Sequence, residues 1–393
     1  MALTKSGLGI LLLVIIGGVL VGSMFFGFSP RLIGLGPTSV SSSLFYSPLA
    51  AAPIATPSAA PKTKPQVYGF LPYWNLKYLD TIDYSHLDDL AFFSVSVNAD
   101  GSLDDHYLGY RRFTTNYQLL NQLASAHHFR LDLVLKSPDD QSLFALLNSP
   151  TAQDNLIQNL TVFINQYPVS GLNLDFEPLS ATDSATTTGL TQLVKQLKIE
   201  NSKLTISLDL YPSAAASQKL WDLAALEPFT DTFIIMTYDY YHPGSSQAGP
   251  VSPLYLAQPD DRHAVMVNLA QISRYLPASK TLLGIPFYGY EWPTQSADFL
   301  SSPSGSGGLA SYARVQNLLR SDLSLVKNWS ASTLTPWLSY QKGTRTYQIY
   351  YDDARSLGYK KQLVNDAGLG GYAIWALGYE GSYADIWQNL ISQ

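Results

Sequence analysis

The middle of the chain reads Ser170-Gly171-Leu172-Asn173-Leu174-Asp175-Phe176-Glu177. Along a β-strand, alternate side chains point to the same face. The large apolar side chains of this stretch therefore share one face, and its polar side chains share the other: Asn173, Asp175 and Glu177. We predict a strand at Gly171–Glu177 whose apolar face packs against helices and whose polar face lines the interior of a barrel.

Asp175 and Glu177 are neighbours on that polar face, about 6.5–7 Å apart. Asp175 can therefore bend to hydrogen-bond Glu177. Two carboxyls in one enclosed site cannot easily both ionise, so one of them keeps its proton near neutral pH, as a general acid must. The alternative is a buried polar network that only fills the barrel. Such a network needs paired charges, and this segment contains no Lys or Arg.

Short apolar runs alternate with helical patterns from Gln66 onward. The candidate strands are Gln66–Pro72, Leu90–Val97, Leu131–Leu135, Gly171–Glu177, Leu204–Leu210, Thr232–Tyr238, Thr281–Phe287 and Gly371–Trp375. Examples of the helical stretches are Asn116–His127, Ser180–Lys198 and Asp352–Asp366. Buried strands with helical crossovers predict the α/β class, and this set of strands predicts a (β/α)8 TIM barrel.

A β-hairpin is expected in the long connection between the last two of these strands. Residues 336–340 and 346–351 have strand character, and Lys342-Gly343 lies at the turn between them. The hairpin either forms a wall beside the site or only packs against the barrel.

The composition excludes several classes of function. The 393-residue chain has a net charge of −6 and no run of Lys and Arg, which argues against nucleic acid as a partner. The absence of cysteine excludes disulfides, thiolate metal sites and a cysteine nucleophile. The six histidines show no HExxH or other metal spacing, so we expect neither a metal nor a cofactor.

The N-terminal region predicts a membrane anchor followed by a tether. After a short tail at residues 1–6, residues 7–29 contain an uncharged apolar stretch of the length that a helix needs to span a bilayer. A cleaved signal peptide is the alternative, but Met24-Phe25-Phe26 follows where small residues usually precede a cleavage site. Residues 30–65 are rich in Ser, Ala and Pro and are expected to form a linker. Residues 66–393 are expected to form the barrel domain.

This organisation predicts a protein held at a membrane with its barrel domain on the outer side, or a secreted protein if the segment is cleaved. Lys5 and Arg31 barely distinguish the two orientations by the positive-inside rule. We expect the barrel to be a monomer.

Polar and aromatic residues gather at the ends of the predicted strands, where the active site of such a barrel lies. Besides the two carboxyls they are Tyr73, Trp74, Tyr211, Tyr238, Asp239, Tyr288 and Trp375. The aromatic members either line a groove or pack at the rim.

These segments resemble glycoside hydrolase family 18, the chitinase family. Residues 170–177 are similar to its DGxDxDxE motif, and further matches follow in the family's order at residues 69–75, 236–239, 249–254, 283–290, 352–357 and 370–375. The chain departs from the motif at Ser170 and Asn173, and Leu135-Lys136-Ser137-Pro138 stands in place of Ser-x-Gly-Gly. The Asn form resembles the branch of spore-germination and cortex-lytic glycosidases.

The resemblance implies hydrolysis of β-1,4 bonds in a polysaccharide that contains N-acetylglucosamine, of the chitin, peptidoglycan or N-glycan type. It also implies a retaining mechanism in which the substrate's own acetamido group attacks. Glu177 would be the general acid and base, Asp175 would hold the acetamido N–H, and Tyr238 would donate to the acetamido oxygen.

The remaining site residues would bind the sugar. Trp375 would form the floor under the ring, and Asp239 would bind the ring or support the carboxyl pair. Asn173 would hydrogen-bond Asp175, which predicts an altered pH dependence and not a loss of activity. The other expected binding residues are Met236, Tyr73, Trp74, Tyr211 and Tyr288.

Two other functions fit the same barrel: a non-catalytic, lectin-like sugar-binding protein, and a structural surface protein. Lectin-like relatives typically lose the last Glu of the motif. The chain keeps Glu177, Asp175 and Tyr238, which favours an enzyme.

Overall fold

The computed structural model describes residues 64–216, 220–259, 261, 264–321 and 324–391, all in one compact unit. The expected anchor at residues 7–29 and nearly all of the expected linker lie outside the described residues. No helix within these ranges is long and apolar enough to cross a membrane.

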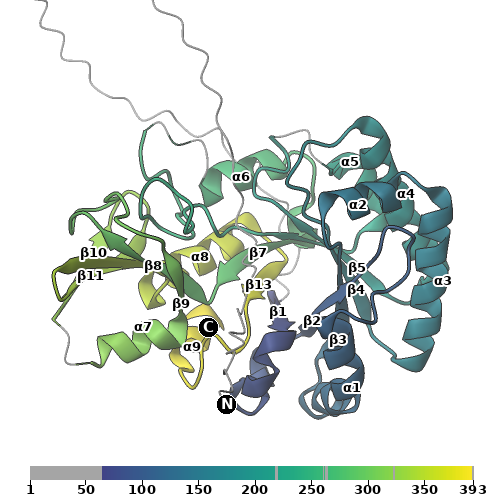
Figure 1. The fold of residues 1–393 in the computed structure, drawn as a ribbon, viewed down its shortest axis with the longest axis horizontal. Helices are drawn as coiled ribbons and strands as arrows, with labels where there is room; N and C mark the ends of the chain where they lie inside the picture. The colour runs from purple at the N-terminus through teal and green to yellow at the C-terminus, as the bar shows by residue number, and fades with distance from the viewer. Residues whose placement is uncertain (1–63, 217–219, 260, 262–263, 322–323, 392–393) are drawn as a thin grey trace, which may run out of the picture. The chain divides into compact units, whose positions relative to one another are not determined.

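Eight parallel strands close into a barrel, as the sequence predicts (Figure 1). They are β1 (Gln66–Pro72), β2 (Asp89–Ser96), β3 (Arg130–Lys136), β4 (Gly171–Asp175), β5 (Thr205–Leu210), β6 (Thr232–Ile235), β7 (Thr281–Pro286) and β13 (Gly371–Trp375). The first and last strands close the seam, where Gln66 of β1 pairs with Gly371 of β13. Each strand otherwise pairs with its neighbours in chain order, which is typical of a TIM barrel.

Helices cover the barrel in the connections between strands (Figure 1). The α-helices are α1 (Leu108–His127), α2 (Asp140–Leu147), α3 (Pro150–Gln166), α4 (Ser184–Glu200), α5 (Leu223–Leu226), α6 (Val265–Ile272), α7 (Tyr312–Leu319), α8 (Ala354–Ala367) and α9 (Asp385–Ile391). The 3-10 helices are η1 (Tyr73–Thr81), η2 (Tyr84–His86), η3 (Glu227–Phe229) and η4 (Ala278–Lys280).

Capping residues explain where two of the predicted helices begin. In α4, the carboxylate of Asp183 accepts a hydrogen bond from the amide of Thr186, so the helix begins four residues later than predicted. In α8, Asp353 and Ser356 form a capping box, and Gly368 ends the helix at φ +62°.

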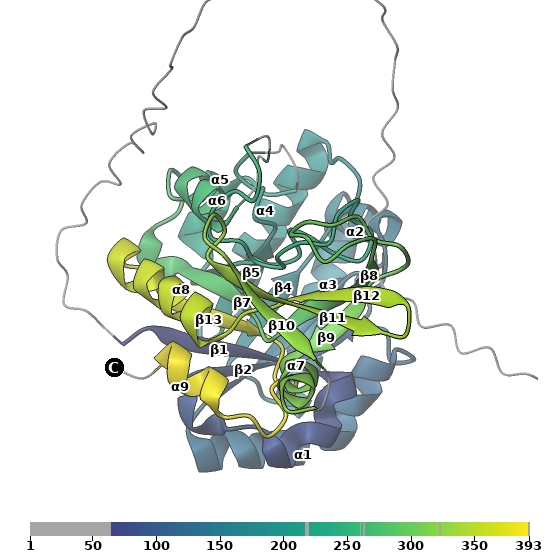
Figure 2. The same ribbon diagram turned by 90° about the vertical axis from the view of Figure 1, so that its left-hand side faces the viewer.

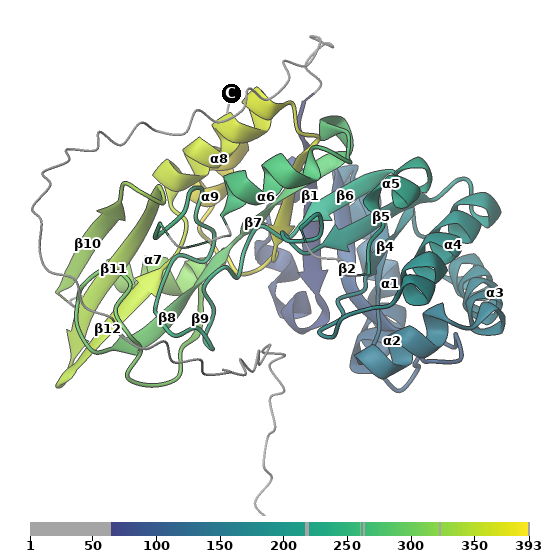
Figure 3. The same cartoon turned by 90° about the horizontal axis from the view of Figure 1, so that it is seen from above.

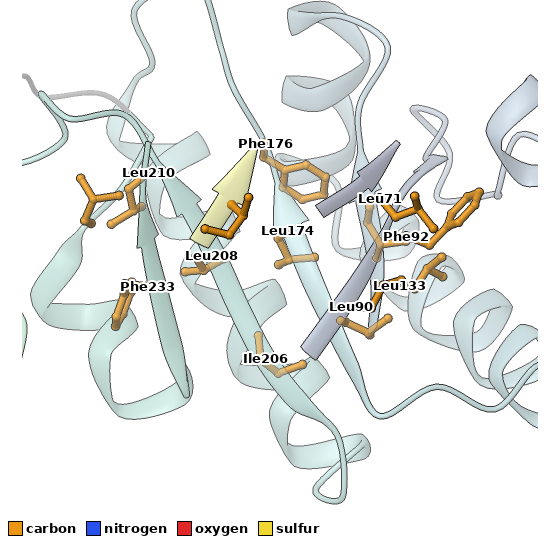
Figure 4. Close-up of a cluster of buried hydrophobic side chains, with 14 of the residues drawn as sticks. Leu71, Leu90, Phe92, Leu133, Leu174, Phe176, Ile206, Leu208, Leu210 and Phe233 are labelled. Carbon is orange, nitrogen blue, oxygen red and sulfur yellow. The ribbon is translucent and has the colours of Figure 1, made fainter. Parts of the chain in front are cut away.

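The two faces of β4 point as the alternation predicts. Its apolar side chains belong to the main hydrophobic core between the strands and the helices, where Figure 4 shows Leu174 and Phe176. The interior of the barrel holds a separate, smaller cluster: Tyr68, Phe70, Ala91, Phe93, Val134, Ile234, Leu282 and Ala373. The polar face of β4 therefore lies in a crowded interior. At Gly171 an added Cβ would stand 2.7 Å from the carboxylate oxygens of Asp132, which explains the glycine at this position.

The expected hairpin is part of a larger sheet. β11 (Thr335–Lys342) and β12 (Arg345–Tyr350) pair around a turn in which Gly343 has φ +64°. They join β8 (Tyr288–Thr294), β9 (Gly308–Ser311) and β10 (Leu325–Ser330) in the order β10-β11-β12-β8-β9. Figures 2 and 3 show this sheet beside the barrel, on the side of β7. The prediction of a small hairpin therefore accounted for only two of the five strands of this sheet.

Two predicted strands end two or more residues early. β4 ends at Asp175, two residues before Glu177, and β6 ends at Ile235. After β6 the backbone turns at Asp239, which takes up the left-handed conformation at φ +59°. Asp is among the few residue types that tolerate this conformation, so the turn was not evident from the sequence.

Glu380 predicts a pH-dependent stability. Glu380 is 2% exposed, and burial raises the pKa of its carboxyl from 4.5 to about 7, against the opposing effect of hydrogen bonds from backbone amides and Trp387. A raised pKa in the folded state makes the protein less stable as pH rises from 4.5 to about 7. We expect Glu380→Gln to stabilise the fold by up to about 3 kcal/mol at pH 8 and to change little at pH 4.

Urea unfolding at the two pH values measures this difference. Glu200→Gln, on the exposed end of α4, is the matched control and should shift stability equally at both. An equal shift for Glu380→Gln would contradict the expectation.

Candidate active site

Asp175 and Glu177 form the centre of the site. Asp175 is the last residue of β4 and is buried, whereas Glu177 follows the strand and reaches solvent at the mouth of the barrel. Their carboxyls share a hydrogen bond that lowers the pKa of Asp175 and raises that of Glu177.

The pKa of Glu177 lies well above its ordinary value. Desolvation of its carboxyl by the surrounding side chains raises the pKa most, followed by the negative charge of Asp175. Desolvation also raises the pKa of Asp175, but its hydrogen bond to Glu177 opposes that rise. The directions of these shifts favour a proton on Glu177 over one on Asp175, which is the arrangement that a general acid needs.

Asn173 does not bind Asp175 as expected. Its side-chain amide donates to Ser207 Oγ at 3.0 Å and to Asp209 Oδ1 at 2.9 Å, so both amide hydrogens are used on β5. The reason is the strand register, which places Asn173 opposite Ser207. The expected support of Asp175 by Asn173 was therefore wrong.

Asp209 thereby joins the site as a third carboxyl, one residue before the end of β5. It is 3% exposed and lies inside the barrel, beside Asn173. Burial and the charge of Asp175 raise its pKa well above the ordinary value. Its negative charge would in turn raise the pKa of Glu177. An acidic residue on the inner face of a neighbouring strand was the available signal.

Two tyrosines contact or face the carboxyls. Tyr211, directly after β5, hydrogen-bonds Glu177. Tyr238 is half-buried after β6, and the pKa of its hydroxyl is raised well above normal, first by desolvation and then by the charges of Asp209 and Glu177. Tyr238 therefore keeps its proton at neutral pH and can act as a hydrogen-bond donor.

Asp239 is fixed by tyrosines from β8. Its Oδ1 accepts hydrogen bonds from Tyr288 and from Tyr290, the latter at 2.8 Å. Tyr288 is only 3% exposed, so it supports Asp239 and does not line an open groove. Met236, two residues before Tyr238 in the chain, is also buried.

Trp375 belongs to an aromatic cluster at the mouth. Its ring centroid lies 4.7 Å from that of Phe93 and 5.6 Å from that of Phe70, in the barrel interior. Trp74 is 42% exposed and lies 6.5 Å from Trp375, and Tyr73 lies 4.9 Å from Trp74. The exposed edge of this cluster gives the site an apolar surface of the kind on which a sugar ring stacks. The peptide bonds Phe93–Ser94 and Trp375–Ala376 are both cis.

The five-stranded sheet contacts this centre. A cluster of its aromatic side chains, including Tyr290, Trp292 and Trp337, packs against Tyr238 and Trp375. The sheet therefore forms a wall beside the site, which was one of the two roles considered for the hairpin. A hollow of ≈ 430 Å³ on this sheet is lined by residues such as Arg314 and Lys342 and by none of the predicted site residues.

Within the described ranges, no group of three or more His, Asp and Glu side chains could hold a metal ion. The carboxyls of the site have other partners: Asp175 and Glu177 hydrogen-bond each other, and Asp209 accepts a hydrogen bond from Asn173.

Comparisons with known proteins identify a matching family and several similar proteins. The model of the family Glycosyl hydrolases family 18 matches residues 66–380. YdhD of Bacillus subtilis (strain 168), whose name describes a sporulation-specific glycosylase, is 30% identical over 241 residues, which are 59% of this chain and 52% of YdhD. The cortical fragment-lytic enzyme of the same organism is 26% identical over 290 residues, 70% of this chain and 62% of that protein.

Among solved structures, the class V chitinase from Nicotiana tobaccum superposes with a TM-score of 0.71 at 20% identity. The match covers 83% of this chain and 98% of the chitinase, and it supports the fold. The chain spans about half the length of YdhD.

Proposed function

Because the chain belongs to glycosyl hydrolase family 18, we propose that it is an O-glycosyl hydrolase that cuts β-1,4 bonds in a polysaccharide containing N-acetylglucosamine. The observation that carries the proposal is the hydrogen bond between the carboxyls of Asp175 and Glu177 at the mouth of the barrel, where the pKa of Glu177 is raised well above its ordinary value. A barrel used only as a scaffold has no need of a protonated carboxyl at its open end.

The reaction begins with proton transfer from Glu177 to the glycosidic oxygen of the leaving sugar. The substrate's acetamido oxygen attacks the anomeric carbon from the other side and forms a cyclic oxazolinium ion. Ionised Asp175 holds the acetamido N–H and stabilises the positive charge. Glu177, now ionised, then takes a proton from water as that water opens the ring.

Other side chains position the sugar. The Tyr238 hydroxyl donates to the acetamido oxygen, and Asp239 is held by Tyr288 and Tyr290 to bind the ring or support the pair. Trp375 provides the floor. Trp74, which is exposed beside it, extends this surface to the next sugar.

Similar proteins support the proposed class of substrate. The Nicotiana tobaccum class V chitinase that resembles this fold has been solved in complex with NAG4. The similarity to YdhD and to the cortical fragment-lytic enzyme favours a glycan of the cell-wall type. We further propose that residues 7–29 anchor the protein to a membrane and that the barrel acts as a monomer outside it.

A lectin-like function remains the second candidate, because the same aromatic surface would bind sugar without cutting it. The hydrogen bond between Asp175 and Glu177, together with the raised pKa of Glu177, favours the enzyme.

The stereochemistry of the first product tests the mechanism. The full-length protein is incubated with chitin oligomers, peptidoglycan strands and N-glycans, and the anomer released is followed by NMR. We expect the β-anomer, because attack by the acetamido group followed by attack of water inverts the carbon twice. An α-anomer would contradict the mechanism, and inactivity on all three glycans would contradict the enzymatic function.

A further inference from the structure

Lys136 places a positive charge beside the catalytic pair. It is the last residue of β3, and the register sets it opposite Asp175 on β4. Alternation along β3 turns it to the same side as Val134, which lies inside the barrel. The sequence showed no basic residue in the carboxylate segment itself. The neighbouring strand supplies one.

The ammonium group of Lys136 lies over the aromatic surface expected to carry the sugar. Its Nζ is 5.8 Å from the ring centroid of Phe93, and that ring lies 4.7 Å from Trp375. The charge also acts on Asp175 and Glu177: desolvation is the main cause of their raised pKa values, and Lys136 opposes the rise in both. Lys136 therefore lies beside both the carboxyl pair and the aromatic surface proposed to bind the glycan.

This lysine forms no salt bridge in the part of the chain that the structure describes. No carboxylate oxygen there lies within 4.0 Å of its Nζ. By contrast, the Nζ of Lys198 lies 2.6 Å from a carboxylate oxygen of Asp231, and that of Lys280 lies 2.8 Å from one of Glu227. A half-buried cation loses part of its hydration and regains that energy only with an anion or a strong acceptor.

We propose that Lys136 is an anion-recognising residue of the glycan groove, and that the substrate is an N-acetylglucosamine polymer whose sugars also carry carboxylate groups. This inference rests on the proposed function. A neutral chain such as chitin offers hydroxyl and amide groups to the lysine, but no opposite charge. A carboxylate on a sugar next to the cleaved bond would form a charge-assisted hydrogen bond with Nζ, in a groove where solvent screens it only partly.

The test compares three tetrasaccharides of matched length. The first alternates N-acetylglucosamine and N-acetylmuramic acid with free lactyl carboxylates. The second is the same molecule with those carboxylates converted to methyl amides, and the third is chitotetraose. The readout is the ratio of kcat/KM for the free acid to that for the amide. We expect a ratio of about ten for the wild type, a ratio near one for Lys136→Met, and most of the preference kept in Lys136→Arg.

The control variant is Lys203→Met, at an exposed position between α4 and β5, which should leave the ratio unchanged. An absence of preference in the wild type would overturn the proposal. A loss in Lys136→Met that is equal for the acid and the amide would also overturn it, because the lysine would then act only through the charges of Asp175 and Glu177.

A binding measurement separates this inference from the proposed function. Titration calorimetry on Glu177→Gln, with and without Lys136→Met, compares the affinities for the acid and the amide in the absence of cleavage. Tighter binding of the acid that depends on Lys136 supports the inference even if the wild type hydrolyses none of the three. Equal affinities would refute it, whatever the activity.

Discussion

Replacing Glu177 by glutamine is expected to lower kcat by about 10³-fold. Glutamine has the same size as glutamate and can still hydrogen-bond Asp175, but it cannot give up a proton to the leaving sugar or take one from water. The full-length variant and the wild type are compared on a labelled N-acetylglucosamine oligomer under saturating conditions. Because only the proton transfers are lost, KM should change by much less than kcat.

Two controls separate chemistry from folding in this comparison. Glu200→Gln removes a carboxyl from the exposed end of α4 and should keep full activity. Glu177→Gln should unfold at a urea concentration no lower than that of the wild type, because it removes a carboxyl whose raised pKa makes the ionised form unfavourable in the folded state. Activity of Glu177→Gln within a few-fold of the wild type would exclude Glu177 as the acid.

Replacing Asp175 by asparagine is expected to lower kcat by about 10²-fold and to shift the pH profile. The loss follows from the missing negative charge beside the cyclic intermediate. The shift follows because the charge of Asp175 is one cause of the raised pKa of Glu177. Without that charge Glu177 loses its proton at lower pH. Activity requires the protonated acid, so the alkaline limb of the kcat/KM profile should move to lower pH.

Profiles of kcat/KM against pH for the wild type and for Asp175→Asn measure this shift. A limb that moves to higher pH, or a profile that keeps its position while kcat falls, would show that the two carboxyls are not coupled in the working enzyme.

The sequence predicted the barrel and the central pair because both depend on local patterns. Alternation along residues 171–177 is enough to put Asp175 and Glu177 on one face, whatever surrounds them. The turn at Lys342-Gly343 likewise identified the hairpin from a few residues. These features need no knowledge of which strand lies next to which.

The contacts around the pair could not be predicted from residues 171–177 alone, because they come from neighbouring strands. Asp209 reaches Asn173 only through the register of β4 and β5, and Lys136 faces Asp175 only through that of β3 and β4. A shift of one residue would turn either side chain away from the barrel interior. Such registers are set by packing over the whole sheet, so the role of Asn173 could not be predicted from its own segment.

Strand β13 combines two duties. It closes the seam by pairing with β1 and β7, and it ends in Trp375, the proposed floor for the sugar. During synthesis, the carboxyls of β4 leave the ribosome some two hundred residues before this tryptophan. A nascent or truncated chain therefore has the acid but neither a closed barrel nor a surface for the sugar. Cutting activity would begin only when the last strand docks, which makes it a direct report of complete folding.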